Sequence, residues 1–247
     1  MSAPEQRSMT MSLRRHDAPA LGYIGGVVLL GAGLIGLCLY RVTFAHQDAR
    51  ILVWAAFAVL TLFCGGLSLR LPIASCVVSF SDGLIFLSVL LFGPELSALT
   101  AALDGYASST RNGGTLRKRL FNTAGMALTV GLSARLFEAV RQGSAGAVTM
   151  DRLLLATISL AASQFVLNTT LVVIVVALSD GMSPLAVLRT SFVWSGLSML
   201  AGSLAAALVY MAIQSLGAAT CLAILPVPVA LHLMYRVVLK RRMQRSL

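Results

Sequence analysis

The fold of this chain is decided by residues 153–178, LLLATISLAASQFVLNTTLVVIVVAL, a stretch without a single charged residue. The hydrocarbon core of a bilayer, about 30 Å thick, requires about 20 consecutive apolar residues in a helix. Residues 153–178 exceed that length and predict a transmembrane helix. The whole chain of 247 residues is 57% hydrophobic and only 11% charged. Soluble domains carry roughly 25% charged residues, so this composition excludes a soluble globular protein.

Seven further apolar runs lie between charged or turn-forming breaks, at 21–40, 51–68, 73–92, 95–110, 120–140, 191–215 and 218–238. The run 95–110 is the weakest because Gly93 and Pro94 precede it and Asp104 interrupts it. A re-entrant segment is the alternative there. We therefore predict an all-α, polytopic integral membrane helical bundle of about eight transmembrane helices.

The distribution of Lys and Arg predicts the orientation, because cytoplasmic loops are enriched in these residues. Eight spans with both termini cytoplasmic leave five of the 19 cations on or near the outer side: Arg41, Arg50, Arg135, Arg141 and Arg152. The cytoplasmic side then carries the other 14: Arg7, Arg14, Arg15, Arg70, Arg111, Arg117, Lys118, Arg119, Arg189, Arg236, Lys240, Arg241, Arg242 and Arg245. Without the fourth span the better orientation places only 12 of the 19 inside, so eight spans are favoured.

This topology divides the chain into a cytoplasmic N-terminal segment (1–20), a transmembrane bundle (21–238) and a short basic cytoplasmic tail (239–247). We expect a multi-pass protein of the bacterial inner (cytoplasmic) membrane. The formal net charge of +10 would suit nucleic-acid binding, but the cations flank apolar runs, as the positive-inside rule predicts. The expected partner of these charges is therefore the lipid bilayer, and no nucleic acid is expected.

Two acids lie inside predicted spans, Asp82 and Asp104. A carboxylate at the centre of a span costs roughly 2.5–3.5 kcal/mol on insertion scales, so something must compensate it. If Gly93 and Pro94 form the outer turn of a hairpin, each acid lies 11 residues from Gly93, about 16 Å from the turn. The two carboxylates can then meet, and their repulsion would favour one protonated form or a bound cation.

Four more polar or amphipathic residues lie at compatible depths and complete the candidate ligand-binding set with the two acids: Asn122, Gln164, Asn168 and Trp194. One interpretation is a pocket for a small polar or zwitterionic ligand. The other is that each amide joins helices through an interhelical hydrogen bond. For the whole set, the sequence favours the pocket.

Glycine is frequent in the first span, at Gly22, Gly25, Gly26, Gly31, Gly33 and Gly36. Small residues permit close helix approach in lipid. Intramolecular packing is the favoured interpretation, and a docking face for a partner is the alternative.

Catalytic motifs are absent from the sequence: there is no G-x-S-x-G, no H-E-x-x-H and no P-loop. An intramembrane aspartyl protease using Asp82 and Asp104 is a weak alternative because the G-x-G-D element of such enzymes is missing. The four cysteines form no C-x-x-C pair. We expect no enzyme activity, no catalytic residue, no metal site and no cofactor.

Scattered positions carry a resemblance to a known family: Ser79–Leu87, Leu90–Pro94, Ala102–Gly105, Ser109, Arg111, Phe121-Asn122, Asn168–Val172, Phe192–Trp194, Leu225-Pro226 and Tyr235-Arg236. Over roughly residues 50–238 the chain resembles the membrane-embedded sensor module that precedes HD-GYP or GGDEF output domains in bacterial signalling proteins. That module is itself similar to the substrate-binding components of vitamin-uptake (energy-coupling-factor) transporters. The resemblance implies a helical module that binds a small ligand in the membrane and signals to the cytoplasm.

One departure from the family concerns the output domain, since only Val237 to Leu247 follow Arg236 here. A separate signalling partner, a stand-alone binding protein and a truncated product all fit. Three functions follow: a sensor acting on a cytoplasmic signalling protein, an uptake component acting with an energy-coupling protein, and a structural or assembly protein. Uptake components often dock through Ala-x-x-x-Ala on the first helix, whereas this chain has Gly22-x-x-x-Gly26 there.

Overall fold

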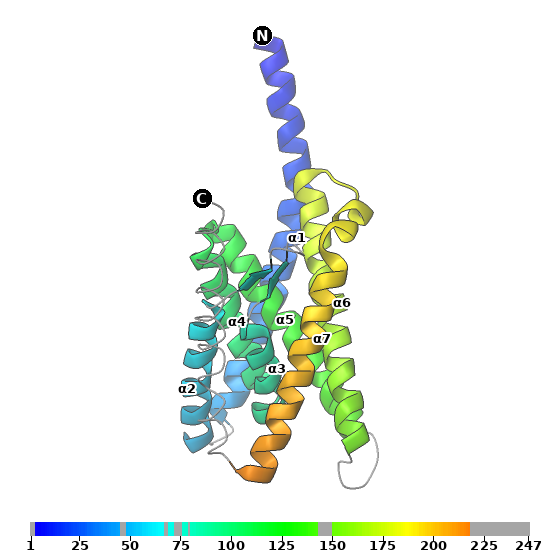
Figure 1. The fold of residues 1–247 in the computed structure, drawn as a ribbon. Coiled ribbons are helices and arrows are strands. Elements are labelled where there is room, and N and C mark those ends of the chain that lie inside the picture. The colour runs from blue at the N-terminus through cyan, green and yellow to red at the C-terminus, as the bar shows by residue number, and fades with distance from the viewer. Residues whose placement is uncertain are drawn as a thin grey trace, which may run out of the picture.

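The computed structural model describes residues 3–44, 48–66, 69–71, 76–78, 80–142 and 150–217. Within these residues the chain forms a bundle of seven helices and one small two-stranded antiparallel sheet (Figure 1). The helices are α1 (Ala3–Phe44), α2 (Asp48–Gly65), α3 (Phe80–Phe92), α4 (Pro94–Arg111), α5 (Leu116–Gln142), α6 (Met150–Asp180) and α7 (Pro184–Leu216). The strands are β1 (Leu69–Leu71) and β2 (Cys76–Val78). The predicted eighth span, 218–238, lies outside the described residues.

Three helical segments are long and apolar enough to cross a membrane: 18–44 of α1, the whole of α6, and 196–216 of α7. Large apolar side chains also cover the outside of the bundle. Leu29 of α1 is 75% exposed and Leu52 of α2 is 73% exposed. So many exposed large apolar side chains favour a lipid environment over water. The chain is therefore a helical membrane protein, as the sequence predicts.

The first helix is longer than the predicted span 21–40, because α1 runs without a break from Ala3 to Phe44. Its N-terminal part projects beyond the rest of the bundle (Figure 1).

The predicted hairpin at Gly93 and Pro94 is confirmed. Helix α3 ends at Phe92 and α4 begins at Pro94. Gly93 has a φ of 84°, a left-handed conformation that glycine adopts without strain. Proline suits the first position of a helix because its missing N–H would have no partner there. The pair therefore reverses the chain within one residue.

The prediction of a helix from residue 73 is wrong in its first part. Cys76–Val78 form strand β2, which pairs with β1 in the register Leu69 to Val78 and Leu71 to Cys76. Helix α3 begins only at Phe80. Short apolar runs with β-branched residues fit a strand as well as a buried helix, and Val77 and Val78 pair with β1 instead of extending α3.

Helix α4, the least apolar of the predicted spans, occupies the middle of the bundle. It packs against α1, α2, α3 and α5. Most of its residues from Leu96 to Gly105 are buried. Because its side chains meet protein on several sides, they need not be apolar enough for lipid. This burial explains how Ser97, Thr100 and Asp104 are tolerated.

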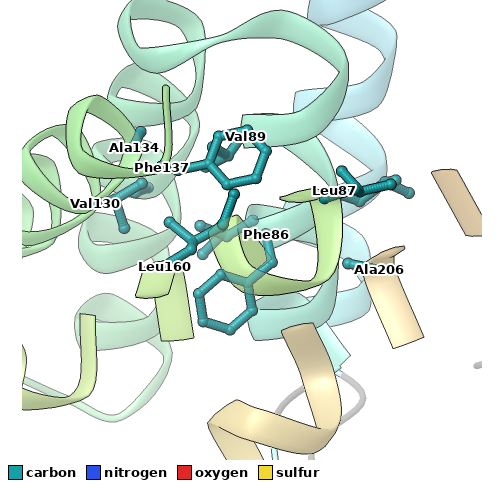
Figure 2. Close-up of a cluster of buried hydrophobic side chains, with 12 residues drawn as sticks. Phe86, Leu87, Val89, Val130, Ala134, Phe137, Leu160 and Ala206 are labelled. Carbon is teal, nitrogen blue, oxygen red and sulfur yellow. The ribbon is translucent and has the colours of Figure 1, made fainter. Parts of the chain in front are cut away.

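The main hydrophobic core surrounds α3. Phe86, Leu87 and Val89 of α3 pack with Phe137 of α5 and Leu160 of α6. Figure 2 shows Phe137 close to Val89 and Phe86 close to Leu160. This cluster links α3 to α5, α6 and α7.

Glycine permits a close approach of α1 to α5. A Cβ added to Gly31 would overlap with the Cβ of Ala124. By contrast, the other glycines of the apolar part of α1 meet nothing within 4 Å in the described structure: Gly22, Gly25, Gly26, Gly33 and Gly36. The favoured interpretation, intramolecular packing, is thus confirmed for Gly31 and not for the other five, which form an open glycine face.

Candidate functional site

A cavity of about 240 Å³ lies between α3, α4, α5 and α6 and contains both predicted acids. We call it the acid cavity. It is lined by Ser81, Asp82, Asp104, Gly105, Ser108, Phe121, Asn122, Gly125, Met126, Asn168, Leu171 and Val172. The hairpin at Gly93 produces this arrangement, because it places the start of α3 beside the second half of α4. The prediction that the two acids lie at one level of the hairpin is confirmed.

Asp104 is buried and held by two neighbours. Ser81 Oγ donates a hydrogen bond of 3.0 Å to Asp104 Oδ2. Arg111 Nη2 lies 3.7 Å from Asp104 Oδ1 in an ion pair. Arg111 follows Asp104 by seven residues, two turns of the helix, so both project from the same face of α4. These contacts compensate the buried carboxylate in part, since Asp104 Oδ1 accepts no hydrogen bond from the described residues.

The last turn of helix α2 packs against the Asp104–Arg111 ion pair. Arg111 Nη1 donates a hydrogen bond of 3.2 Å to the carbonyl of Leu62 in the last turn of α2. The last four carbonyls of a helix lack partners within it, so the guanidinium satisfies one of them. Gly65 lies so close that an added Cβ would be 2.6 Å from Asp104 Oδ1 and 2.7 Å from Arg111 Nη2. A larger residue at position 65 would force the ends of the Asp104 and Arg111 side chains to shift.

Asp82 is placed differently from Asp104. It lies in the first turn of α3, where a negative charge is favoured by the helix dipole. It is half-buried and lines the acid cavity. Within the described residues, no ion pair joins a cation to Asp82 and Arg111 is the cation paired with Asp104. When both carboxyl groups are ionised, they and the single guanidinium leave one negative charge at this site.

Two predicted amides share the acid cavity with the acids. Asn168 of α6 is half-buried and lines it. Asn122 of α5 is exposed and lines it as well. Helix α5 approaches α4 closely at this level, since a Cβ added to Gly105 would lie 2.7 Å from the carbonyl oxygen of Asn122. Four of the six predicted residues, Asp82, Asp104, Asn122 and Asn168, therefore line one cavity.

Gln164 lies elsewhere, within the contact between α5 and α6. Its Nε2 donates a hydrogen bond of 3.1 Å to Thr129 Oγ1, and its Oε1 accepts one of 3.4 Å from Ser133 Oγ. Both ends of the amide are thus engaged by helix α5, as the interhelical alternative expects. Trp194 belongs to α7, and its side chain lies outside the described residues.

Sequence reasoning missed Gly65 and the pairing of Arg111 with Asp104. The spacing of seven residues was a usable signal for the pair, because it places both on one helix face. Gly65 carried no comparable signal, since a glycine near a helix end is typical of an ordinary C-terminal cap. Its role depends on where α2 meets α4, which is a property of the tertiary structure.

The chemistry of the acid cavity suits a small ligand that donates hydrogen bonds or carries a positive charge. Carboxylates accept hydrogen bonds, and amide side chains both donate and accept them. The volume of the acid cavity is below the roughly 300–1,000 Å³ of sites for drug-sized molecules.

Within the described part of the chain, no three His, Cys, Asp or Glu side chains gather closely enough to hold a metal ion.

No family model, no curated protein and no solved structure matches this chain. The likeness to membrane-embedded sensor modules therefore stays a prediction from sequence.

Proposed function

We propose that this protein is a membrane-embedded sensor-like module that binds a small, positively charged polar ligand in the acid cavity and signals to a cytoplasmic partner. One observation carries the proposal. Asp82 faces a cavity that it shares with Asp104, Asn122 and Asn168, while only Asp104 has a cationic partner within the described residues. A cationic ligand would pair with the Asp82 carboxylate. Such pairing is favourable because an unpaired carboxylate is costly inside a membrane protein.

The position of the acid cavity suits signalling, because a ligand there contacts two pairs of helices. Asp82 and Asp104 come from the α3–α4 hairpin, whereas Asn122 and Asn168 come from α5 and α6. A ligand that binds one arrangement of these helices better than another shifts their equilibrium. Arg111 and the turn after α4 adjoin this site and would transmit the shift to a partner.

The proposed placement in the membrane is eight spans, with both termini cytoplasmic, in the bacterial inner membrane. The order of the described helices supports it. Successive helices cross the bundle in alternating directions, so the end of α4, the start of α5 and the turn from α6 to α7 lie at one end (Figure 1). That end carries Arg117, Lys118 and Arg119, as the positive-inside rule expects of the cytoplasmic side.

The substrate-binding component of a solute-uptake transporter is the second candidate. The open glycine face of α1 favours it, because small residues on the first helix suit docking against a membrane-embedded coupling protein. The same face would also serve a signalling partner. Accumulation of labelled ligand in vesicles that contain the protein and its partners separates uptake from sensing.

The proposal is tested by thermal unfolding of the purified full chain in mild detergent with choline, ethanolamine and tetramethylammonium as cationic probes. Glycerol and acetate serve as the neutral and anionic probes. A ligand that binds only the folded state stabilises it by about 2.7 kcal/mol at roughly 100 times its Kd. At least one cationic probe is expected to raise the unfolding temperature, and the neutral and anionic probes are not.

The matched variants are Asp82→Asn, which removes the cavity carboxylate, and Asp151→Asn, which removes an exposed carboxylate at the start of α6. The shift should vanish in the first and persist in the second. Equal shifts in both variants, or no shift with any cationic probe, would contradict the proposal.

A further inference from the structure

A second and larger cavity opens between α1, α5 and α6, at the end of the bundle that carries Arg117. We call it the lateral groove. Its volume is about 980 Å³, at the upper end of the roughly 300–1,000 Å³ typical of small-molecule sites. Its walls are mainly apolar and include Ile24, Leu120, Val172 and Val176. Helices α1 and α6 are joined beside it, where Tyr23 Oη donates a hydrogen bond of 3.3 Å to the carbonyl of Leu171.

The rim of the lateral groove is positively charged. Arg117 and Lys118 line it from the first turn of α5, beside Thr115. The exposed N–H groups of a helix N-terminus add partial positive charge at the same place. Asp180 is the acid among the lining residues, so the two cations exceed it by one charge. This end of the groove is complementary to an anion.

The long axis of the groove follows the helices. Val172 precedes Asp180 by eight residues, which is about 12 Å along α6. The charged rim is thus at one end of α5 and α6, and the apolar wall extends from it toward the middle of the bundle. A molecule with an anionic headgroup and an apolar tail has its charge and its apolar part in the same order.

We propose that the lateral groove binds one anionic phospholipid, with its phosphate at Arg117 and Lys118 and an acyl chain along Val172 and Val176. A soluble anion would use the rim alone and would leave the apolar wall unfilled. A zwitterionic lipid would fill the wall without using the excess positive charge. The bilayer supplies anionic lipid next to any helix surface, and each Lys or Arg near an anionic leaflet contributes favourably to such binding.

The lateral groove and the acid cavity are distinct sites that share Phe121, Asn122 and Val172 as a common wall. Lipid binding in the groove does not depend on the function proposed for the acid cavity. Asp82 does not line the groove, so Asp82→Asn should leave lipid binding unchanged.

The test is native mass spectrometry of the full chain released from nanodiscs that contain equal amounts of phosphatidylglycerol and phosphatidylcholine. The wild-type chain should retain one phosphatidylglycerol, with a preference of about tenfold over phosphatidylcholine. The double substitution Arg117→Gln with Lys118→Gln should remove the preference. Val176→Trp should fill the groove and remove retention while the charges stay.

Two matched controls accompany these variants. Arg141→Gln with Arg152→Gln removes two cations at the far end of α5 and the start of α6. Val166→Trp adds the same bulk at a position of α6 that is 58% exposed. Both should retain phosphatidylglycerol, and free glycerol phosphate should not displace it.

Four results would overturn the proposal. The first is equal retention of the two lipids, and the second is a Val176→Trp variant that retains as much phosphatidylglycerol as Val166→Trp. The third is a loss of lipid from the control variants as complete as that from the groove variants. The fourth is a second copy of the chain that occupies this face without lipid.

Discussion

Asp82 and Asp104 line the same cavity but are held by different contacts. Asp104 accepts a hydrogen bond from Ser81 and pairs with Arg111. No hydrogen bond or ion pair to another described residue is found for Asp82. The two carboxylates are therefore expected to have separate roles, Asp104 in stability and Asp82 in ligand binding.

This division predicts different stability effects for two isosteric substitutions. Asp104→Asn removes the charge that Arg111 and Ser81 contact, and it should destabilise the chain by about 1–3 kcal/mol. Asp82→Asn removes a carboxylate that no described cation pairs with, so it should leave the free energy of unfolding unchanged or raise it. Denaturation of both variants in mild detergent measures the difference. A loss of stability in Asp82→Asn as large as in Asp104→Asn would favour the structural or assembly role.

Gly65→Ala is the second prediction for a single residue. The added methyl group would lie within 2.7 Å of both members of the Asp104–Arg111 ion pair. The pair must move or separate, with an expected cost of about 1–3 kcal/mol. Gly33→Ala is the control, because a Cβ there meets nothing within 4 Å. Equal unfolding temperatures for the two variants would show that α2 does not close on the ion pair as described.

At the scale of helices, small residues set the distance between α1 and α5. Gly31→Ala would place a Cβ in overlap with the Cβ of Ala124 and 2.5 Å from its Cα. Backbone atoms cannot rotate away, so α1 must separate from α5. We expect a destabilisation of about 1–3 kcal/mol, measured by thermal unfolding beside Gly36→Ala. Gly36 belongs to the open glycine face, and its substitution should be neutral in the isolated chain.

The elements differ in how far the sequence could predict them. Gly93 and Pro94 identified the α3–α4 hairpin because each residue has a specific backbone preference at such a turn. Strand β2 was missed because an apolar run such as Cys76–Val78 has no period that separates strand from helix. The position of Gln164 was not predictable either, since its partners Thr129 and Ser133 lie on another helix. Sequence patterns report local preference, whereas these contacts depend on helix packing.

At the scale of the whole molecule, the proposed topology predicts which turns face the cytoplasm. The four native cysteines are replaced by alanine, and single cysteines are introduced at Asn112, Met182 and Met150. Asn112 follows α4 and Met182 lies between α6 and α7, whereas Met150 begins α6 at the opposite end. A membrane-impermeant maleimide added to intact cells should label Met150→Cys alone. Labelling of Asn112→Cys or Met182→Cys from outside would reverse the orientation.

The central claim is that the acid cavity holds a small ligand. Native mass spectrometry of the full chain, purified from its membrane in mild detergent, tests it most directly, with Asp82→Asn and Asp151→Asn prepared in parallel. We expect one bound small molecule in the wild-type chain and in Asp151→Asn, and none in Asp82→Asn. A molecule retained equally by all three chains, or no bound molecule in any of them while all are folded, would contradict the claim.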